Sequence, residues 1–179
     1  NYKNIISPKI SINKFLFDQN IFFTISHGYS PPNIDETLDE KGFVNPNIKP
    51  ETGWNFELGS KGNLIKNKIS YDISLYLMKI KNLLVAQRTA EDTFVGVNAG
   101  KTSHPGIEIT INSKLWNSVK KENNIKSEIY FSKTWYEFIE FINKDTDYSG
   151  KTVTGVPSYK ISNILIINMN NFKTIIDFQ

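Results

Sequence analysis

The feature that most constrains this chain is an alternation of apolar and polar residues with a period of two. Residues 107–111 give the clearest case, reading Ile-Glu-Ile-Thr-Ile, and the segments 21–26, 54–59 and 71–78 alternate in the same way. Successive side chains of a β-strand point to opposite faces of the sheet, so each segment is expected to form a strand with one apolar and one polar face. Helical periodicity is weak throughout the 179 residues, and the chain is predicted to be all-β.

About eight strands are expected, and several of them are long. They are Ile5–Phe15, Asn20–Tyr29, Thr52–Leu64, Ile69–Val85, Phe94–Trp116, Lys126–Phe141, Pro157–Met169 and Phe172–Phe178. Strands of soluble proteins usually have about five or six residues, whereas a tilted strand needs roughly nine to eleven to cross a membrane. The lengths therefore favour a segment of an antiparallel, up-and-down transmembrane β-barrel.

The connections between these strands alternate between a shorter and a longer class. The shorter ones are 16–19, 65–68, 117–125 and 170–171, and the longer ones are 30–51, 86–93 and 142–156. Transmembrane barrels show this alternation because their turns are short on one side of the membrane and their loops are long on the other. A soluble sandwich has no reason to maintain it.

Aromatic residues make up 13% of the chain, and several lie near the ends of the expected strands. Phe15, Phe17, Trp116 and Phe172 lie at short-turn ends, and Trp54, Trp135, Tyr136 and Phe138 lie toward long-loop ends. Membrane barrels carry aromatic belts at both interfaces, so two such belts are expected here. The alternative is that these side chains cover the core of a soluble sandwich.

The sequence contains little that supports catalysis, a bound metal or nucleic-acid binding. The formal charge of +3 comes from scattered residues that form no basic stripe. Cysteine is absent, and His27 and His104 are too far apart in the sequence for a zinc motif. Acidic loop residues such as Asp145 and Asp147 would catalyse acid–base chemistry only if the fold held them across a cleft, and nothing in the sequence indicates such a cleft. Neither a phosphate-binding loop nor a nucleophile elbow is found. We therefore expect no enzymatic activity, no cofactor, no metal site and no nucleic-acid partner.

Four short motifs follow one another between residues 26 and 157. The first is 26–32, Ser-His-Gly-Tyr-Ser-Pro-Pro, followed by Glu36, and the second is 45–52, Asn-Pro-Asn-Ile-Lys-Pro-Glu-Thr, followed by 54–59. The third is Asn98-Ala99-Gly100 with Gly106-Ile107-Glu108, and the fourth is Tyr148-Ser149-Gly150 with Gly155-Val156-Pro157. In this order they resemble barrel segments of the TonB-dependent outer-membrane receptors, with Thr154 where that family usually has proline.

The resemblance implies a barrel of about 22 strands with a folded N-terminal plug and a short segment that contacts the energy-coupling protein TonB. Neither a plug nor such a segment is recognised within residues 1–179, which are expected to be an internal fragment of the later half of the barrel domain. Taken alone, the fragment is expected to form an open curved sheet. The implied location is the lipid bilayer of the outer membrane of a Gram-negative bacterium. The implied function is to bind and import a scarce small-molecule nutrient, with a ferric siderophore or another iron chelate as the first choice.

Ligand contact is expected from the outer loops. Arg88 and Glu91 lie in the connection 86–93, where the planar guanidinium of Arg88 would hold an anionic chelate. The alternative is that Arg88 pairs with Glu91 or Asp92 within the loop. His27 is a further candidate near a strand exit. Polar wall residues are expected to face a hydrated lumen, as inward residues of any wide barrel do, and they include Glu57, Asp72, Glu108 and Lys114.

Two other functions fit parts of the sequence. Eight strands suffice to close a small barrel, which would serve as a structural or adhesion protein of the outer membrane and would pair its first and last strands. A soluble β-sandwich would bind carbohydrate and would pack its apolar faces against each other. The long connection 30–51 and the four motifs favour the receptor over the small barrel, and the strand lengths favour it over the sandwich.

Overall fold

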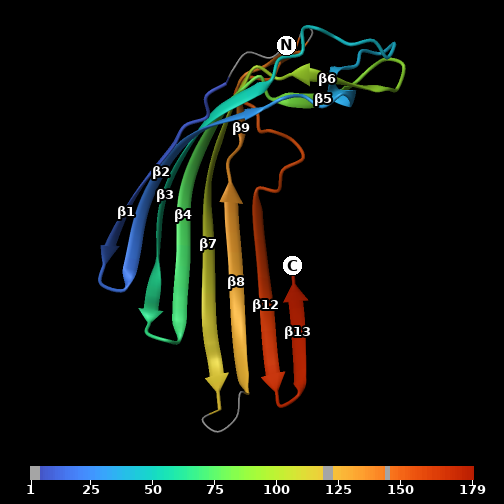
Figure 1. Cartoon of the computed structure of the whole chain (residues 1–179). Coiled ribbons are helices and arrows are strands. Elements are labelled where there is room, and N and C mark those ends of the chain that lie inside the picture. Colours follow the sequence, from blue (N-terminus) through green and yellow to red (C-terminus); the bar gives the residue numbers. More distant parts are fainter. Residues whose placement is uncertain (1–4, 119–122, 144–145) are drawn as a thin grey trace.

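The computed structural model describes residues 5–118, 123–143 and 146–179, in which nearly all secondary structure is antiparallel β-sheet. The long strands, shown in Figure 1, are β1 (Lys9–Leu16), β2 (Gln19–Ser30), β3 (Glu51–Ile65), β4 (Ile69–Lys81), β7 (Lys101–Asn117), β8 (Asn124–Thr134), β12 (Tyr159–Met169) and β13 (Phe172–Phe178). The short elements are the 3₁₀-helix η1 (Asp35–Thr37) and the strands β5 (Leu84–Arg88), β6 (Phe94–Asn98), β9 (Glu137–Glu140), β10 (Ile142–Asn143) and β11 (Thr146–Asp147). Among the described residues, no helix is long and apolar enough to cross a membrane. The all-β prediction is confirmed.

The long strands form one open, curved sheet (Figure 1). The order across this sheet is β1-β2-β3-β4-β7-β8-β12-β13, and every pairing along it is antiparallel. β1 and β13 lie at opposite edges and, within the part of the chain that the structure describes, do not pair with each other. The expected open sheet of about eight strands is therefore confirmed. The pairing of first and last strands that a small closed barrel requires is not seen in the described residues.

The register gives the sheet two chemically different faces, because residues directly opposite each other on paired strands point to the same side. One row across the sheet consists of Phe23, Leu58, Leu75 and Ile107. The next row consists of Thr24, Glu57, Tyr76 and Gly106. We call the side of the first row the apolar face and the side of the second the polar face. Leu58 and Leu75 are each 50% exposed on the apolar face, and since a β-sandwich buries such side chains, this exposure argues against the soluble alternative.

Three of the expected strands are shorter than predicted, because the backbone turns at the end of the sheet that carries the long connections. The strands expected at Ile69–Val85 and Phe94–Trp116 are observed in the main sheet only as β4 and β7. Between β4 and β7, Asn82 (φ 57°) and Gly100 (φ 40°) adopt the left-handed conformation, which interrupts an extended strand. The residues between these two turns form the separate β5–β6 hairpin.

The third of these strands, expected at Lys126–Phe141, breaks at Trp135 and Tyr136. β8 ends before the break and pairs with β7 and β12, while β9 follows it and pairs with β7 alone among the described strands. As a result, Phe138 is only 7% exposed and belongs to a small buried core, and Tyr136 hydrogen-bonds to Tyr76 of the polar face. The expectation that Tyr136 and Phe138 contribute to an aromatic belt is therefore wrong, whereas Trp135 is exposed.

Two glycines of the polar face lie beneath aromatic rings of a neighbouring strand. Phe22 covers Gly59 and Tyr76 covers Gly106, and each ring occupies the space that a Cβ atom of the glycine would need. The residues of each pair are directly opposite each other on paired strands. An aromatic ring over a cross-strand glycine stabilises an otherwise weak position of a sheet and helps to fix its register. The register in turn decides which side chains each face carries.

Candidate ligand-binding site

Two segments with little long-strand structure lie at one end of the sheet in Figure 1, opposite the short turns. They are the loop 31–50, which contains η1, and residues 82–100, which contain the β5–β6 hairpin. We call these two segments the loop unit. Any ligand that is held by the long connections of β2, β3, β4 and β7 is bound at this end.

The side chain of Asn98 joins the two parts of the loop unit. Lys49 N–H donates a hydrogen bond to Asn98 Oδ1 (2.8 Å), and Asn98 Nδ2 donates to the carbonyls of Lys49 (2.9 Å) and Asn82 (2.8 Å). A primary amide has one acceptor oxygen and two donor hydrogens, so each of these groups of Asn98 has a partner. The loop and the hairpin, 49 positions apart at this point, are thereby held together.

Two further hydrogen bonds lie next to this bridge, one from the loop unit to the sheet and one between the two parts of the loop unit. Leu84 N–H donates to Glu51 Oε1 (2.6 Å), and Asn82 Nδ2 donates to the Pro50 carbonyl (3.3 Å). A hydrogen bond to a carboxylate is stronger than one to a neutral acceptor, and the bond to Glu51 is partly buried. Because Glu51 is the first residue of β3, its carboxylate ties the base of the hairpin to a long strand.

The two residues after Asn98 have no room for larger side chains. Ala99 is completely buried, and its N–H donates to the Leu83 carbonyl (2.6 Å). Gly100 has a positive φ, and a Cβ atom at this position would overlap the carbonyl oxygen of Glu140. Each residue of the Asn-Ala-Gly motif therefore has a structural role, and its asparagine bonds directly to the Lys-Pro-Glu motif of the long loop.

A cavity of about 320 Å³ lies between the two parts of the loop unit. Its lining combines acidic, basic and apolar residues: Leu38, Asp39, Glu40, Lys41, Asn45, Val95, Gly96 and Val97. Gly96 lies so close to the Glu36 carbonyl that a Cβ atom would overlap it, which brings the hairpin into contact with η1. Asp39 Oδ1 accepts the N–H groups of Lys41 and Phe43, both at 2.9 Å, and so fixes the loop on the other side. The cavity has the size and mixed polarity that suit a small polar ligand.

The polar face near the loop unit carries a cluster of ring side chains. The hydroxyl oxygens of Tyr76 and Tyr136 are 2.9 Å apart, and the rings of His104 and Tyr136 stack with centroids 4.3 Å apart at an angle of 19°. Thr102 and His104 are buried, and neither Thr102 Oγ1 nor His104 Nε2 has a hydrogen-bond partner among the described residues. This cluster gives the wall a stiff aromatic surface beside the loop unit.

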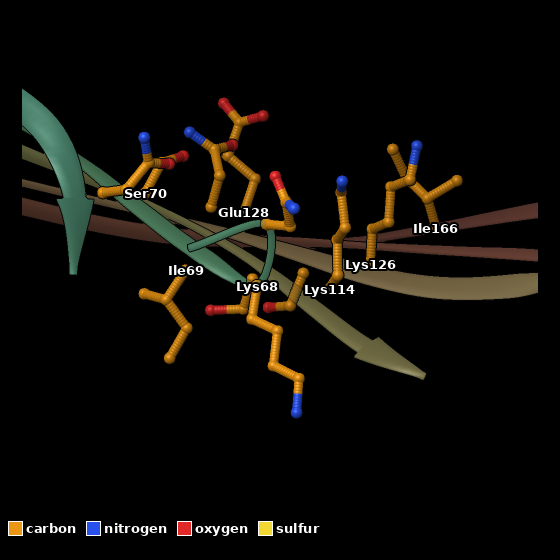
Figure 2. A pocket seen from close by; sticks show the side chains of 12 residues that line it. Lys68, Ile69, Ser70, Lys114, Lys126, Glu128 and Ile166 are labelled. Atoms are coloured by element: carbon orange, nitrogen blue, oxygen red, sulfur yellow. The ribbon is translucent and has the colours of Figure 1, made fainter. Parts of the chain in front are cut away.

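A further cavity, of about 260 Å³, lies near the short-turn end of the sheet (Figure 2). Lys114 and Lys126 are directly opposite each other on β7 and β8, and in Figure 2 they extend in the same direction while Lys68 points away from them. Like charges directly opposite each other destabilise a sheet unless another group neutralises them, and Glu128 also lines this cavity. This part of the polar face therefore suits an acidic partner group.

The polar wall residues named from the sequence all lie on the polar face. The register pairs Glu57 with Tyr76, Asp72 with Thr110, Glu108 with Ser74, and Lys114 with Lys126. The Tyr130 hydroxyl donates to Glu108 Oε1 (3.2 Å), so Glu108 is already part of a hydrogen bond across the wall. The predicted division of the strands into polar and apolar sides is confirmed for these residues.

A family model described as TonB dependent receptor-like, beta-barrel, matches residues 1–171. The chain belongs to this family. Members of the family are outer-membrane proteins of Gram-negative bacteria. The resemblance drawn from the four sequence motifs is thus confirmed.

Solved structures of TonB-dependent transporters share the fold of this chain. A structure described as "Copper transporter OprC" has a TM-score of 0.70 and 14% sequence identity, with 93% of this chain and 24% of that protein covered. The FrpB iron transporter from Neisseria meningitidis (F3-3 variant) has a TM-score of 0.62 and 14% identity, with 96% of this chain and 25% of that protein covered. The chain therefore spans about a quarter of the length of these transporters. A comparison with curated proteins gives no match.

Within the receptor barrel, the three predicted ligand contacts lie in two different regions. Arg88, at the end of β5, forms an ion pair with Asp92, as the alternative interpretation of the sequence expected, and the two side chains are 66% and 71% exposed. Glu91 is exposed in the turn of the same hairpin. His27 lies in β2 on the apolar face, with its ring centroid 5.1 Å from that of Trp54. The structure therefore brings Arg88 and Glu91 together and leaves His27 on a different surface.

The residues that organise the loop unit were not identified from the sequence. Asn98 and Glu51 were noticed only as members of receptor motifs, and the motifs themselves were their signal. The motifs do not reveal that Asn98 hydrogen-bonds to the backbone of Lys49 in the motif 45–52, because this contact joins positions far apart in the chain.

Proposed function

We propose that the receptor containing this chain binds an iron chelate, most readily a ferric siderophore, and imports it across the outer membrane of a Gram-negative bacterium. The chain contributes a section of the barrel wall and part of the outer loops. The observation that carries this proposal is the loop unit, which is fixed at one end of an open sheet whose two faces differ in polarity. The apolar face then contacts lipid and the polar face lines the hydrated lumen, as in transmembrane barrels generally.

Ligand binding is assigned to the outer side of the loop unit. Arg88 and Glu91, at the hairpin tip, are the proposed contacts, and Arg88 holds an anionic chelate when its guanidinium exchanges the Asp92 carboxylate for the ligand. The pair is mostly exposed, so this exchange requires little free energy. His27 lies near the loop end of β2 but on the apolar face, so we propose that it contacts the ligand only at the rim, before the ligand enters the lumen.

The proposed process is binding and gated passage, without covalent chemistry. The energy comes from TonB, which acts through parts of the receptor outside this chain. The chain's own role is to position the ligand over the lumen and to supply polar wall residues such as Glu57 and Glu108 along the path. Iron is proposed as the cargo because iron chelates are the frequent ligands of this family.

The test is uptake of a radiolabelled ferric siderophore by cells in which the full receptor is the only member of its family. Accumulation of iron is expected to depend on TonB and to fall by about tenfold or more when residues 34–47 are replaced by a Gly-Ser linker. The matched control replaces the short turn Lys66-Asn67 by Ser-Gly, which puts glycine at the left-handed position of Asn67 (φ 60°), leaves the loop unit intact and should leave uptake unchanged.

The outcomes separate the parts of the proposal. Accumulation of another metal in place of iron would retain import and reject the iron chelate. A receptor that is folded in the membrane but accumulates no chelate at all would reject the proposed function. Equal uptake after removal of residues 34–47 would show that the loop 31–50 does not hold the ligand.

A further inference from the structure

A cavity of about 580 Å³ lies at the loop end of the apolar face, where β3, β4, β7 and β9 meet. Basic, aromatic and acidic side chains line it together: His27, Trp54, Lys79, Lys81, Lys101 and Glu137. We call it the rim cavity. It shares only His27 with the residues proposed for contact with the imported ligand, and it opens on the other side of the wall from the lumen.

The register shows that the charged side chains of the rim cavity continue the apolar face. One row across four strands consists of Trp54, Lys79, Ser103 and Glu137. The next row toward the loops pairs Lys81 with Lys101. The two rows in the opposite direction pair Phe56 with Leu77 and Leu58 with Leu75. A band of apolar side chains therefore ends in a row that combines tryptophan with lysine.

The lysines of the rim cavity exceed the carboxylates that neutralise them. Lys101 forms an ion pair with Glu140, whereas Lys79 and Lys81 form no ion pair with any described residue. Lys81 is directly opposite Lys101, an arrangement of like charges that destabilises a sheet. Among the described lining residues, Glu137 carries the only carboxylate. The cavity thus retains a positive charge that an anion would neutralise.

We propose that the rim cavity binds the phosphate-bearing headgroup of an anionic lipid from the surrounding bilayer. The ammonium groups of Lys79 and Lys81 hold phosphate oxygens through charge-assisted hydrogen bonds, while their aliphatic stems lie along the apolar surface. The acyl chains lie along the rows of Phe56 and Leu58. This inference rests on the proposed function, because it requires the apolar face to contact lipid.

The position of Trp54 supports a lipid over a free anion. Its ring lies against His27, and the side chain is 43% exposed at the end of the apolar band. Tryptophan favours the depth at which lipid headgroups meet acyl chains, because its ring is apolar and its N–H is polar. A soluble anion would gain nothing from this ring or from the exposed leucines below it, whereas a lipid contacts all of them.

The test measures lipid that remains bound to the full receptor. The receptor is placed in bilayer discs of equimolar phosphatidylcholine and phosphatidylglycerol, extracted into mild detergent, and analysed for bound phosphatidylglycerol by mass spectrometry. The K79Q/K81Q variant is expected to retain about tenfold less phosphatidylglycerol than the unaltered receptor. K79R/K81R, which keeps both charges, is expected to retain as much. The matched control is K114Q/K126Q, which removes two neighbouring lysines from the polar face and should leave the retained amount of phosphatidylglycerol unchanged.

Several results would overturn the inference. Equal retention by K79Q/K81Q and the unaltered receptor would show that the rim cavity does not bind the lipid. An equally large loss in K114Q/K126Q would show that net charge, and not this cavity, attracts the lipid. Displacement of the lipid by millimolar inorganic phosphate would show that the cavity takes a free anion. A receptor that does not insert into the discs would overturn the proposed function as well. A receptor that inserts into the discs without retaining phosphatidylglycerol, and that still imports the siderophore in cells, would overturn this inference alone.

Discussion

Replacing Asn98 by alanine should release the long loop from the β5–β6 hairpin while the sheet stays intact. The substitution removes three hydrogen bonds of 2.8–2.9 Å, two to the backbone of Lys49 and one to the Asn82 carbonyl. Each such bond contributes about 0.5–1.5 kcal/mol net. The two bonds to Lys49 are exposed and lie at the lower end of this range, so we expect the free energy of opening the loop unit to fall by about 2 kcal/mol.

A loss of about 2 kcal/mol increases the population of the open loop roughly 30-fold. Hydrogen–deuterium exchange of the full receptor in detergent, read by mass spectrometry, measures this population. Backbone amides in 44–52 and 82–98 should exchange roughly 30-fold faster in the alanine variant, and those in 107–112 should not change. Asn163→Ala is the matched control, because Asn163 donates to Ser127 Oγ (2.7 Å) and to the Glu128 carbonyl (3.2 Å), both within the sheet.

Three results would refute this reasoning. Unchanged exchange in 44–52 would show that Asn98 does not hold the loop in place. Equal acceleration in 107–112 would show that the substitution weakens the whole barrel and that the effect is not local to the loop unit. Acceleration of 44–52 in Asn163→Ala would remove the distinction between the bridge and the sheet.

Further substitutions test three individual contacts. Gly59→Ala should lower the free energy of unfolding by about 1–3 kcal/mol, because its Cβ overlaps the Phe22 ring. In urea unfolding, the double variant with Phe22→Ala should recover part of this loss, and strictly additive losses would contradict the contact. Gly100→Ala should be more harmful, since φ is positive and the overlap is with a backbone oxygen, and a normal amount of folded receptor in the outer membrane would argue against this strain. Arg88→Gln should change stability by less than about 1 kcal/mol but weaken siderophore binding, whereas Asp92→Asn should tighten it by freeing the guanidinium. Equal affinities of both variants in titration calorimetry would exclude Arg88 from the ligand site.

The sheet was predictable because its signal is local. In 107–111 the alternation of apolar and polar residues assigns each side chain to a face without knowledge of the neighbouring strands, and the structure confirms that assignment. The strand breaks were not predictable in the same way. Asn82 and Gly100 are residue types that readily become left-handed, but Leu83, Leu84 and Val85 follow Asn82 directly, so the apolar pattern alone does not mark the end of β4. Asn82 donates hydrogen bonds to the Pro50 carbonyl of the long loop and to the Gly100 carbonyl, and the pattern does not describe either contact.

In the candidate site, too, the local contacts could be predicted from the sequence and the distant contacts could not. The pairing of Arg88 with Asp92 joins residues four positions apart and was foreseen as an alternative from the sequence. The bridge from Asn98 to Lys49 joins residues 49 positions apart and depends on the order of the strands. His27 was selected as a polar residue near a strand exit, but the face to which it points depends on the register, which places it beside Trp54.

The difference between local and distant contacts also separates the rigid wall from the proposed binding surface. The wall strands are joined by continuous ladders of backbone hydrogen bonds, of which the pairings β3–β4 and β4–β7 each extend over most of β4. The loop unit has no comparable ladder outside its hairpin. Among its described residues, Ala99 is the only hydrophobic one that is buried. It is therefore held largely by side-chain hydrogen bonds such as those of Asn98 and Glu51, which open at lower free energy than a strand ladder. A ligand that bridges the loop and the hairpin would strengthen this weak connection, so that binding orders the loop unit while the wall keeps its register.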